Sequence, residues 1–190
     1  MSKIVSGTNV FKYRAPLSES WIPFNGRFSP VQENVMGHHD SKIDQYPGKK
    51  TEGFLVLRTR IPWDVKISTS FFIETELKDQ DCLSPLTVLV IGSQIVDFFE
   101  GGKVVISNWH EDLSWDVIKM GKGPYSSLKS KLEVTVQRSG ETLKVMDAKK
   151  ALILSANIHR SKSNHGNDEV FAIGNRCSRA IFSPVTIATD

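Results

Sequence analysis

The sequence predicts an all-β protein built as a two-sheet antiparallel β-sandwich. Apolar and polar residues alternate with a period of two in many short runs, which is typical of half-buried strands. Turn residues separate these runs about every 8–12 residues, a spacing typical of sandwiches and barrels. No segment keeps a helical period over three turns, so we expect helices to be short or absent.

The alternation is clearest at residues 131–137, where Leu132, Val134 and Val136 share one face and polar residues occupy the other. This pattern predicts an antiparallel strand with those three side chains buried. A Ser139-Gly140 turn follows, and apolar residues two apart resume after it. The combination predicts a tight hairpin.

A second hairpin is predicted where residues 95–100 and 103–108 flank Gly101-Gly102. Just before it, residues 86–91 are apolar on both faces apart from Thr87, which predicts a central strand covered on each side. Further runs predict strands at residues 9–14, 54–59, 65–69, 71–78, 114–120, 151–158, 170–173 and 181–189.

We expect residues 1–190 to form one domain, because a chain of this length buries close to 70% of its unfolded surface in a single core. Residues 17–52 break the strand pattern with prolines and glycines. They are interpreted as a long irregular connection, a ragged edge hairpin or an arm. The aromatic residues in this segment, Trp21, Phe24, Phe28 and Tyr46, favour packing on the sandwich over a free linker.

Charge and composition argue against several partners and cofactors. The net charge is +3 and basic residues alternate with acidic ones, so we expect no nucleic-acid partner. No apolar run is long enough to span a membrane, and the chain starts without the apolar run of a signal peptide, which predicts a cytoplasmic protein or a piece of a larger one. Cys82 and Cys177 form either one disulfide or two free thiols. No nucleotide or metal-ligand motif occurs, so we expect no cofactor and no metal.

From about Phe71 onward, the order of features resembles the concanavalin A-like, or laminin-G-like, jelly-roll superfamily of lectins and glucanases. The resemblance rests on the runs FIETEL, IG, LEVTVQR, FAIGN and FSPVTI, which begin at Phe72, Ile91, Leu132, Phe171 and Phe182. It implies that residues 181–187 pair beside residues 10–13. The galectin order of site residues and the Glu-x-Asp-x-x-Glu run of laminarinase-type enzymes are both absent, so neither subfamily is implied.

The richest candidate site is residues 108–116, which hold two tryptophans, a histidine and three carboxylates at the end of a hairpin. Sugars stack on aromatic faces while polar groups hold their hydroxyls, so this composition favours a glycan site. The alternative is that the tryptophans are buried in the core and the charges only solvate a turn. The predicted ligand-binding residues here are Asn108, Trp109, His110, Glu111, Asp112 and Trp115.

A second polar cluster, Asn157, His159 and Arg160, lies on the loop before the penultimate strand and is a further candidate for ligand binding. Ordinary turn chemistry is the competing explanation. For catalysis the best pair is Glu74 and Glu76, two apart on one strand and therefore on one face. Those two glutamates are equally explained as the solvent face of their strand.

These observations predict a non-catalytic recognition module, with a glycan as the preferred ligand and a protein as the next. The first alternative is a structural or interaction subunit, such as a spike or coat domain, with residues 17–52 docking on a partner. The second is a jelly-roll glycoside hydrolase that uses Glu74 and Glu76.

Overall fold

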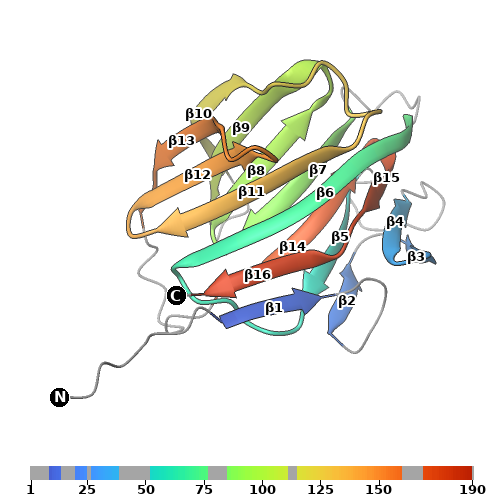
Figure 1. Cartoon of the computed structure of the whole chain (residues 1–190), viewed down its shortest axis with the longest axis horizontal. Helices are drawn as coiled ribbons and strands as arrows, with labels where there is room; N and C mark the ends of the chain where they lie inside the picture. The colour runs from blue at the N-terminus through green and yellow to red at the C-terminus, as the bar shows by residue number, and fades with distance from the viewer. Residues whose placement is uncertain are drawn as a thin grey trace.

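The computed structural model describes residues 9–13, 20–24, 27–38, 52–76, 85–110, 115–159 and 169–189. Within these ranges the chain forms sixteen strands and one short 3-10 turn, η1 (Glu100–Gly102). The strands build two antiparallel sheets that face each other across a common core (Figure 1). The predicted two-sheet sandwich is confirmed.

Sheet A has nine strands and sheet B has seven. Sheet A runs in the order β13 (Leu152–Asn157), β12 (Thr142–Asp147), β11 (Leu132–Ser139), β6 (Val65–Glu76), β15 (Ser178–Phe182), β4 (Asn34–His38) and β3 (Arg27–Val31), with β16 (Val185–Thr189) beside β6 and β1 (Asn9–Tyr13) beside β16. Sheet B runs in the order β10 (Trp115–Lys122), β9 (Lys103–Trp109), β8 (Gln94–Phe99), β7 (Leu86–Ile91), β14 (Phe171–Arg176), β5 (Glu52–Leu57) and β2 (Trp21–Phe24).

The two predicted hairpins are present. Strands β11 and β12 pair with Val136 opposite Val145, and Gly140 at the turn has a φ of 54°. Strands β8 and β9 pair across η1, where Gly101 has a φ of 83°, a left-handed conformation that glycine adopts without strain. The predicted central strand is β7, which lies in the middle of sheet B. It contributes to apolar clusters on both of its faces.

Two strand boundaries differ from the prediction. Residues 65–69 and 71–78 were expected as two strands, but β6 runs unbroken over twelve residues, because Ser70 continues the ladder between them. This length lets one edge of β6 pair with β16 near its start and with β15 near its end. Conversely, residues 181–189 are two strands, because Pro184 lacks the N–H that the ladder would need.

The expected pairing of the last strand with the first is confirmed, since Ile187 of β16 lies opposite Phe11 of β1. Within residues 17–52 the structure has strands β2, β3 and β4, where composition predicted an irregular connection, a ragged hairpin or an arm. Trp21 and Phe28 from this segment are buried. Pro23 and Pro30 are tolerated because β2 and β3 are edge strands.

The core between the sheets contains the predicted inward set of β11, because Leu132, Val134 and Val136 are all buried. The charged side chain of Arg138 is also buried there. Cys177 is a buried free thiol, and Cys82 lies outside the described residues. No helix among the described residues is long and apolar enough to cross a membrane.

Candidate functional site

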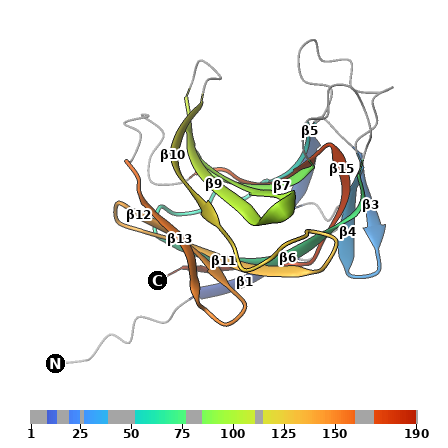
Figure 2. The ribbon, with the colours of Figure 1, turned by 90° about the horizontal axis from the view of Figure 1, so that it is seen from above.

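Sheet B curls so that its outer face is concave, as Figure 2 shows from β10 to β5. The period-2 pleat divides the residues of each strand between this face and the core. On β9, for example, Val104 and Ile106 enter the core, whereas Val105 and Ser107 line a hollow on the concave face. The hollow has a volume of about 240 Å³.

The floor of the hollow is apolar. Leu86, Val88 and Ile95 form a small buried cluster on the concave side of β7 and β8, separate from the main core. Phe54 closes one end, where its ring lies across Gly174 in the space that a Cβ would fill. A side chain at position 174 would therefore displace the ring and change the shape of the hollow.

Two tryptophans stand at the other end of the hollow. Trp109 at the end of β9 and Trp115 at the start of β10 are directly paired across the two strands, and both line the hollow. Trp109 is partly buried against the apolar floor, whereas 47% of Trp115 is exposed. One tryptophan thus supports the floor while the other offers an accessible aromatic surface.

Three charged side chains line the same hollow: Asp97, Lys103 and Arg176. Asp97 comes from the centre of β8, next to the valine and phenylalanine that enter the core. The ammonium of Lys103 lies 5.2 Å from the centre of the Phe99 ring, which is a cation–π distance. The hollow therefore combines an apolar floor and an exposed indole with groups that donate and accept hydrogen bonds.

Two further residues of the first predicted cluster, Asn108 and His110, are described by the structure. Nε2 of His110 lies 2.8 Å from Oδ2 of Asp116, and this hydrogen bond joins the ends of β9 and β10. Asn108 points to the other side of β9 from Trp109, where its Oδ1 lies 3.5 Å from Nε2 of Gln94. Glu111 and Asp112 lie outside the described residues.

Two residues of the second predicted cluster, Asn157 and His159, lie at the end of a strand of the other sheet or just after it. Asn157 ends β13 of sheet A, opposite Thr142, and His159 follows it; both are exposed. Neither lines the concave hollow. Arg160 lies outside the described residues.

The predicted carboxylate pair is on the far side of the molecule from the hollow. Ile73 enters the core, so Glu74 and Glu76 point to the outer face of sheet A. Glu74 lies 3.6 Å from the guanidinium of Arg179, and Glu76 lies 3.2 Å from the ammonium of Lys129. Each glutamate thus has a cationic neighbour, and neither faces the concave hollow. Among the described residues, no group of three or more His, Cys, Asp or Glu side chains could hold a metal ion.

No protein-family model and no curated protein sequence matches this chain. Solved structures match it over nearly its whole length. The chain superposes on the carbohydrate-binding module CBM66 from Bacillus subtilis with a TM-score of 0.67 at 15% identity, covering 90% of this chain and 96% of that one. The Bacillus licheniformis β-glucanase matches with a TM-score of 0.64 at 7% identity, covering 98% and 99%. The winged bean acidic lectin, complexed with methyl-α-D-galactose, matches with a TM-score of 0.60 at 13% identity, covering 96% and 98%.

The chain has a concanavalin A-like jelly-roll fold. The resemblance inferred from the order of strands is therefore confirmed at the level of the fold. Lectins, a carbohydrate-binding module and glucanases all share this jelly roll, so the fold alone does not choose between binding and hydrolysis.

Sequence reasoning missed the residues that line the hollow away from the tryptophans. Asp97 carried a signal, because it is a lone carboxylate among the apolar residues 95–99 of β8. Phe54 and Arg176 carried none, since they reach the jelly roll's concave face only through the pairing of β14 with β5 and β7. Local sequence patterns do not predict which distant strands pair in a sheet.

Proposed function

We propose that this protein is a non-catalytic, lectin-like carbohydrate-binding module whose glycan site is the concave hollow of sheet B. The observation that carries the proposal is the pair of tryptophans, Trp109 and Trp115, at one end of that hollow. A sugar ring has an apolar face that packs against an indole, while its hydroxyls need polar partners at the edge. The hollow is also lined by three polar side chains, those of Asp97, Lys103 and Arg176.

The size of the hollow supports a small bound unit. Its volume of about 240 Å³ is below the roughly 300–1,000 Å³ of typical small-molecule pockets. We therefore expect a single sugar residue, or the end of a longer chain, to enter it. Two of the proteins with this jelly roll are named as binders of carbohydrate or as bound to a galactoside, which supports the same ligand class.

The test is a glycan array with the full chain, followed by titration of the best ligand against single variants. Trp115→Ala should weaken binding at least about tenfold, a loss of roughly 1.4 kcal/mol of binding free energy. Its effect on the free energy of unfolding should stay within about 1 kcal/mol, because nearly half of the side chain is already exposed. Trp109→Ala should weaken binding and also destabilise by about 1–3 kcal/mol, since this indole packs on the apolar floor.

The matched control is Leu152→Ala, which truncates another large exposed apolar side chain, 60% exposed, that does not line the hollow. It should leave the affinity unchanged. An array without any bound glycan would overturn the proposal, and so would an affinity that survives Trp115→Ala.

A second candidate, an interaction subunit, is favoured by the edge of sheet B. Ile22 is 43% exposed and Phe24 is 56% exposed on β2, within the segment predicted to dock on a partner. Exposed apolar groups on an edge strand are typical of protein–protein contacts. Size-exclusion chromatography of the chain and of the Ile22→Ser/Phe24→Ser double variant tests this candidate, which predicts a self-association that the double variant loses.

A further inference from the structure

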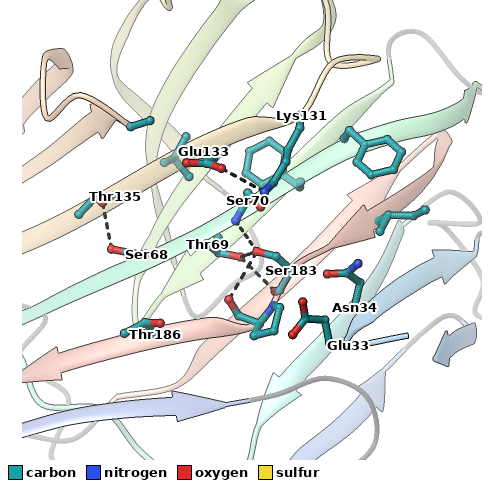
Figure 3. Close-up of a pocket in the computed structure, with 16 residues that line it drawn as sticks. Glu33, Asn34, Ser68, Thr69, Ser70, Lys131, Glu133, Thr135, Ser183 and Thr186 are labelled. Carbon is teal, nitrogen blue, oxygen red and sulfur yellow. Dashed lines mark hydrogen bonds and ion pairs between the residues drawn. The ribbon is translucent and has the colours of Figure 1, made fainter. Parts of the chain in front are cut away.

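A second hollow, of about 550 Å³, lies on the outer face of sheet A, on the opposite side of the molecule from the tryptophans. It forms where β6 ends its pairing with β16 and begins its pairing with β15. The link between those two strands, Ser183 and Pro184, forms one side of it. Figure 3 shows this outer hollow.

The floor of the outer hollow is a row of hydroxyl groups. Thr135 on β11, Ser68 on β6 and Thr186 on β16 are direct neighbours across three adjacent strands. The hydroxyls of Ser68 and Thr135 are 2.9 Å apart and hydrogen-bonded. Ser70 is the next outward residue of β6, and it is only 5% exposed.

Short side chains make up this floor. On β6 the outward residues that line the hollow are Ser68, Ser70 and Phe72, and the next outward positions on either side, Lys66 and Glu74, carry long charged side chains that do not line it. Ser183, in the link between β15 and β16, is tied to β6, since its Oγ accepts a hydrogen bond of 2.8 Å from the backbone N–H of Ser70. The backbone N–H of Ser183 in turn donates to the carbonyl of Ser70 at 2.8 Å. The link is therefore fixed to β6 and keeps the hollow open.

The walls supply apolar surface and charge. Phe72 and Ile181, which are direct neighbours on β6 and β15, form an apolar patch beside the floor. Glu133 lies opposite Ser70 on β11, and its carboxylate is 3.0 Å from the ammonium of Lys131. Figure 3 shows Glu33, from the turn between β3 and β4, and Asn34, the first residue of β4, facing Ser183 at the edge of the outer hollow.

We infer that the outer hollow is a second binding site, and that its ligand is a neutral monosaccharide or disaccharide. Serine and threonine hydroxyls both donate and accept hydrogen bonds, as sugar hydroxyls do. Carboxylates such as those of Glu33 and Glu133 accept hydrogen bonds from adjacent hydroxyl pairs. The apolar patch matches the C–H face of a sugar ring. The rim carries both signs of charge, which favours a neutral ligand over a strongly charged one.

This inference is independent of the concave site, because the two hollows share no residue. The test is an NMR titration of the ¹⁵N-labelled full chain with D-glucose, D-galactose, D-mannose and D-fructose. At least one sugar should shift the amide signals of Ser68, Thr135 and Thr186 in a saturable way, with a dissociation constant on the order of 1–10 mM. Shifts at Trp109 and Trp115 would report the concave site separately.

Ser68→Tyr places a ring across the floor and should abolish those shifts. The position is on the outer face and a strand accepts tyrosine well, so the variant should fold. Lys66→Tyr makes the same substitution two residues earlier on the same face, outside the outer hollow, and should leave the shifts intact. Glu133→Gln, which keeps the size of the side chain, should weaken binding at least about fivefold.

Three results would overturn the inference. One is the absence of saturable shifts at the floor residues with all four sugars. Another is a set of shifts that persists in Ser68→Tyr. The third is a loss of shifts in Lys66→Tyr equal to that in Ser68→Tyr.

Discussion

Substitution of the buried arginine should be among the most destabilising single changes at the interface between the two sheets. Arg138 of sheet A has a side-chain exposure of 0%, and its guanidinium lies 2.5 Å from the carboxylate of Glu169. It donates hydrogen bonds to the carbonyls of Trp63 and Ile91 and to Oε1 of Gln94 at 2.7, 2.9 and 2.8 Å. The guanidinium carbon also lies 4.2 Å from the centre of the Trp63 ring.

The cost of Arg138→Met follows from what the substitution leaves behind. Breaking a buried ion pair typically costs about 3–5 kcal/mol, because the other charge stays buried without its partner. Glu169 is 17% exposed, so water can reach part of its carboxylate. We therefore expect the lower end of that range, about 3 kcal/mol. For a chain of this size, that corresponds to a fall in melting temperature of about 6–12 °C.

Denaturant unfolding and thermal melts measure this loss directly. The matched control is Arg179→Met, because Arg179 and Glu74 are 46% and 43% exposed and 3.6 Å apart. An exposed pair of this kind contributes only about 0.2–1 kcal/mol. A cost for Arg138→Met within 1 kcal/mol of the Arg179→Met cost would show that the buried network does not stabilise the fold, and the reasoning would be wrong.

Three further predictions concern stability. Val136→Ala should destabilise by about 1–3 kcal/mol and Thr135→Ala by less, as judged by denaturant melts, because Val136 is fully buried and Thr135 lies on the outer face. Gly92→Ala should lower the free energy of unfolding by about 2 kcal/mol or more, since φ is +63° and the added Cβ would meet the carboxylate of Glu169. The control Gly140→Ala places its Cβ in open space and should cost about 1 kcal/mol in the same assay. Burial, and secondarily the charge of Glu100, raises the pKa of Tyr125 above its ordinary value, so the folded state favours the neutral phenol. The free energy of unfolding should therefore fall as pH rises above about 10. Tyr125→Phe, which has no phenol to ionise, should show a smaller fall over that range.

Local pattern was enough to predict most of the sandwich. The period-2 alternation and the glycine turns are properties of neighbouring residues, so both hairpins and the inward face of β11 could be inferred from the sequence. The same alternation, continued from Val136, places Arg138 on the inward face as well. A charged residue next to a turn is ordinarily exposed to solvent, and only the structure shows the acceptors that make the burial of Arg138 possible.

Strand ends were less predictable, because they depend on partners. Residues 65–69 and 71–78 were predicted as two strands divided at Ser70, which ends a run of three polar residues. In the structure Ser70 lies on the floor of the outer hollow and is tied to Ser183, which is 113 residues away. The tryptophan pair was accessible to sequence reasoning because Trp109 and Trp115 belong to one hairpin. The rest of the concave hollow was not, because it is assembled from strands that are distant in the chain.

The pleat also separates the residues that line the two hollows from those that fill the core. Strands such as β6 and β9 give one face to the core and the other to a hollow, so exposed side chains that line a hollow can change with little effect on the fold. The exception lies at the end of the sandwich near the tryptophans. Gln94 accepts a hydrogen bond from Arg138 at 2.8 Å, and its Nε2 lies 3.5 Å from Oδ1 of Asn108, the residue before Trp109. Polar contacts thus lead from the buried arginine through Gln94 to Asn108, which precedes Trp109 at the end of β9.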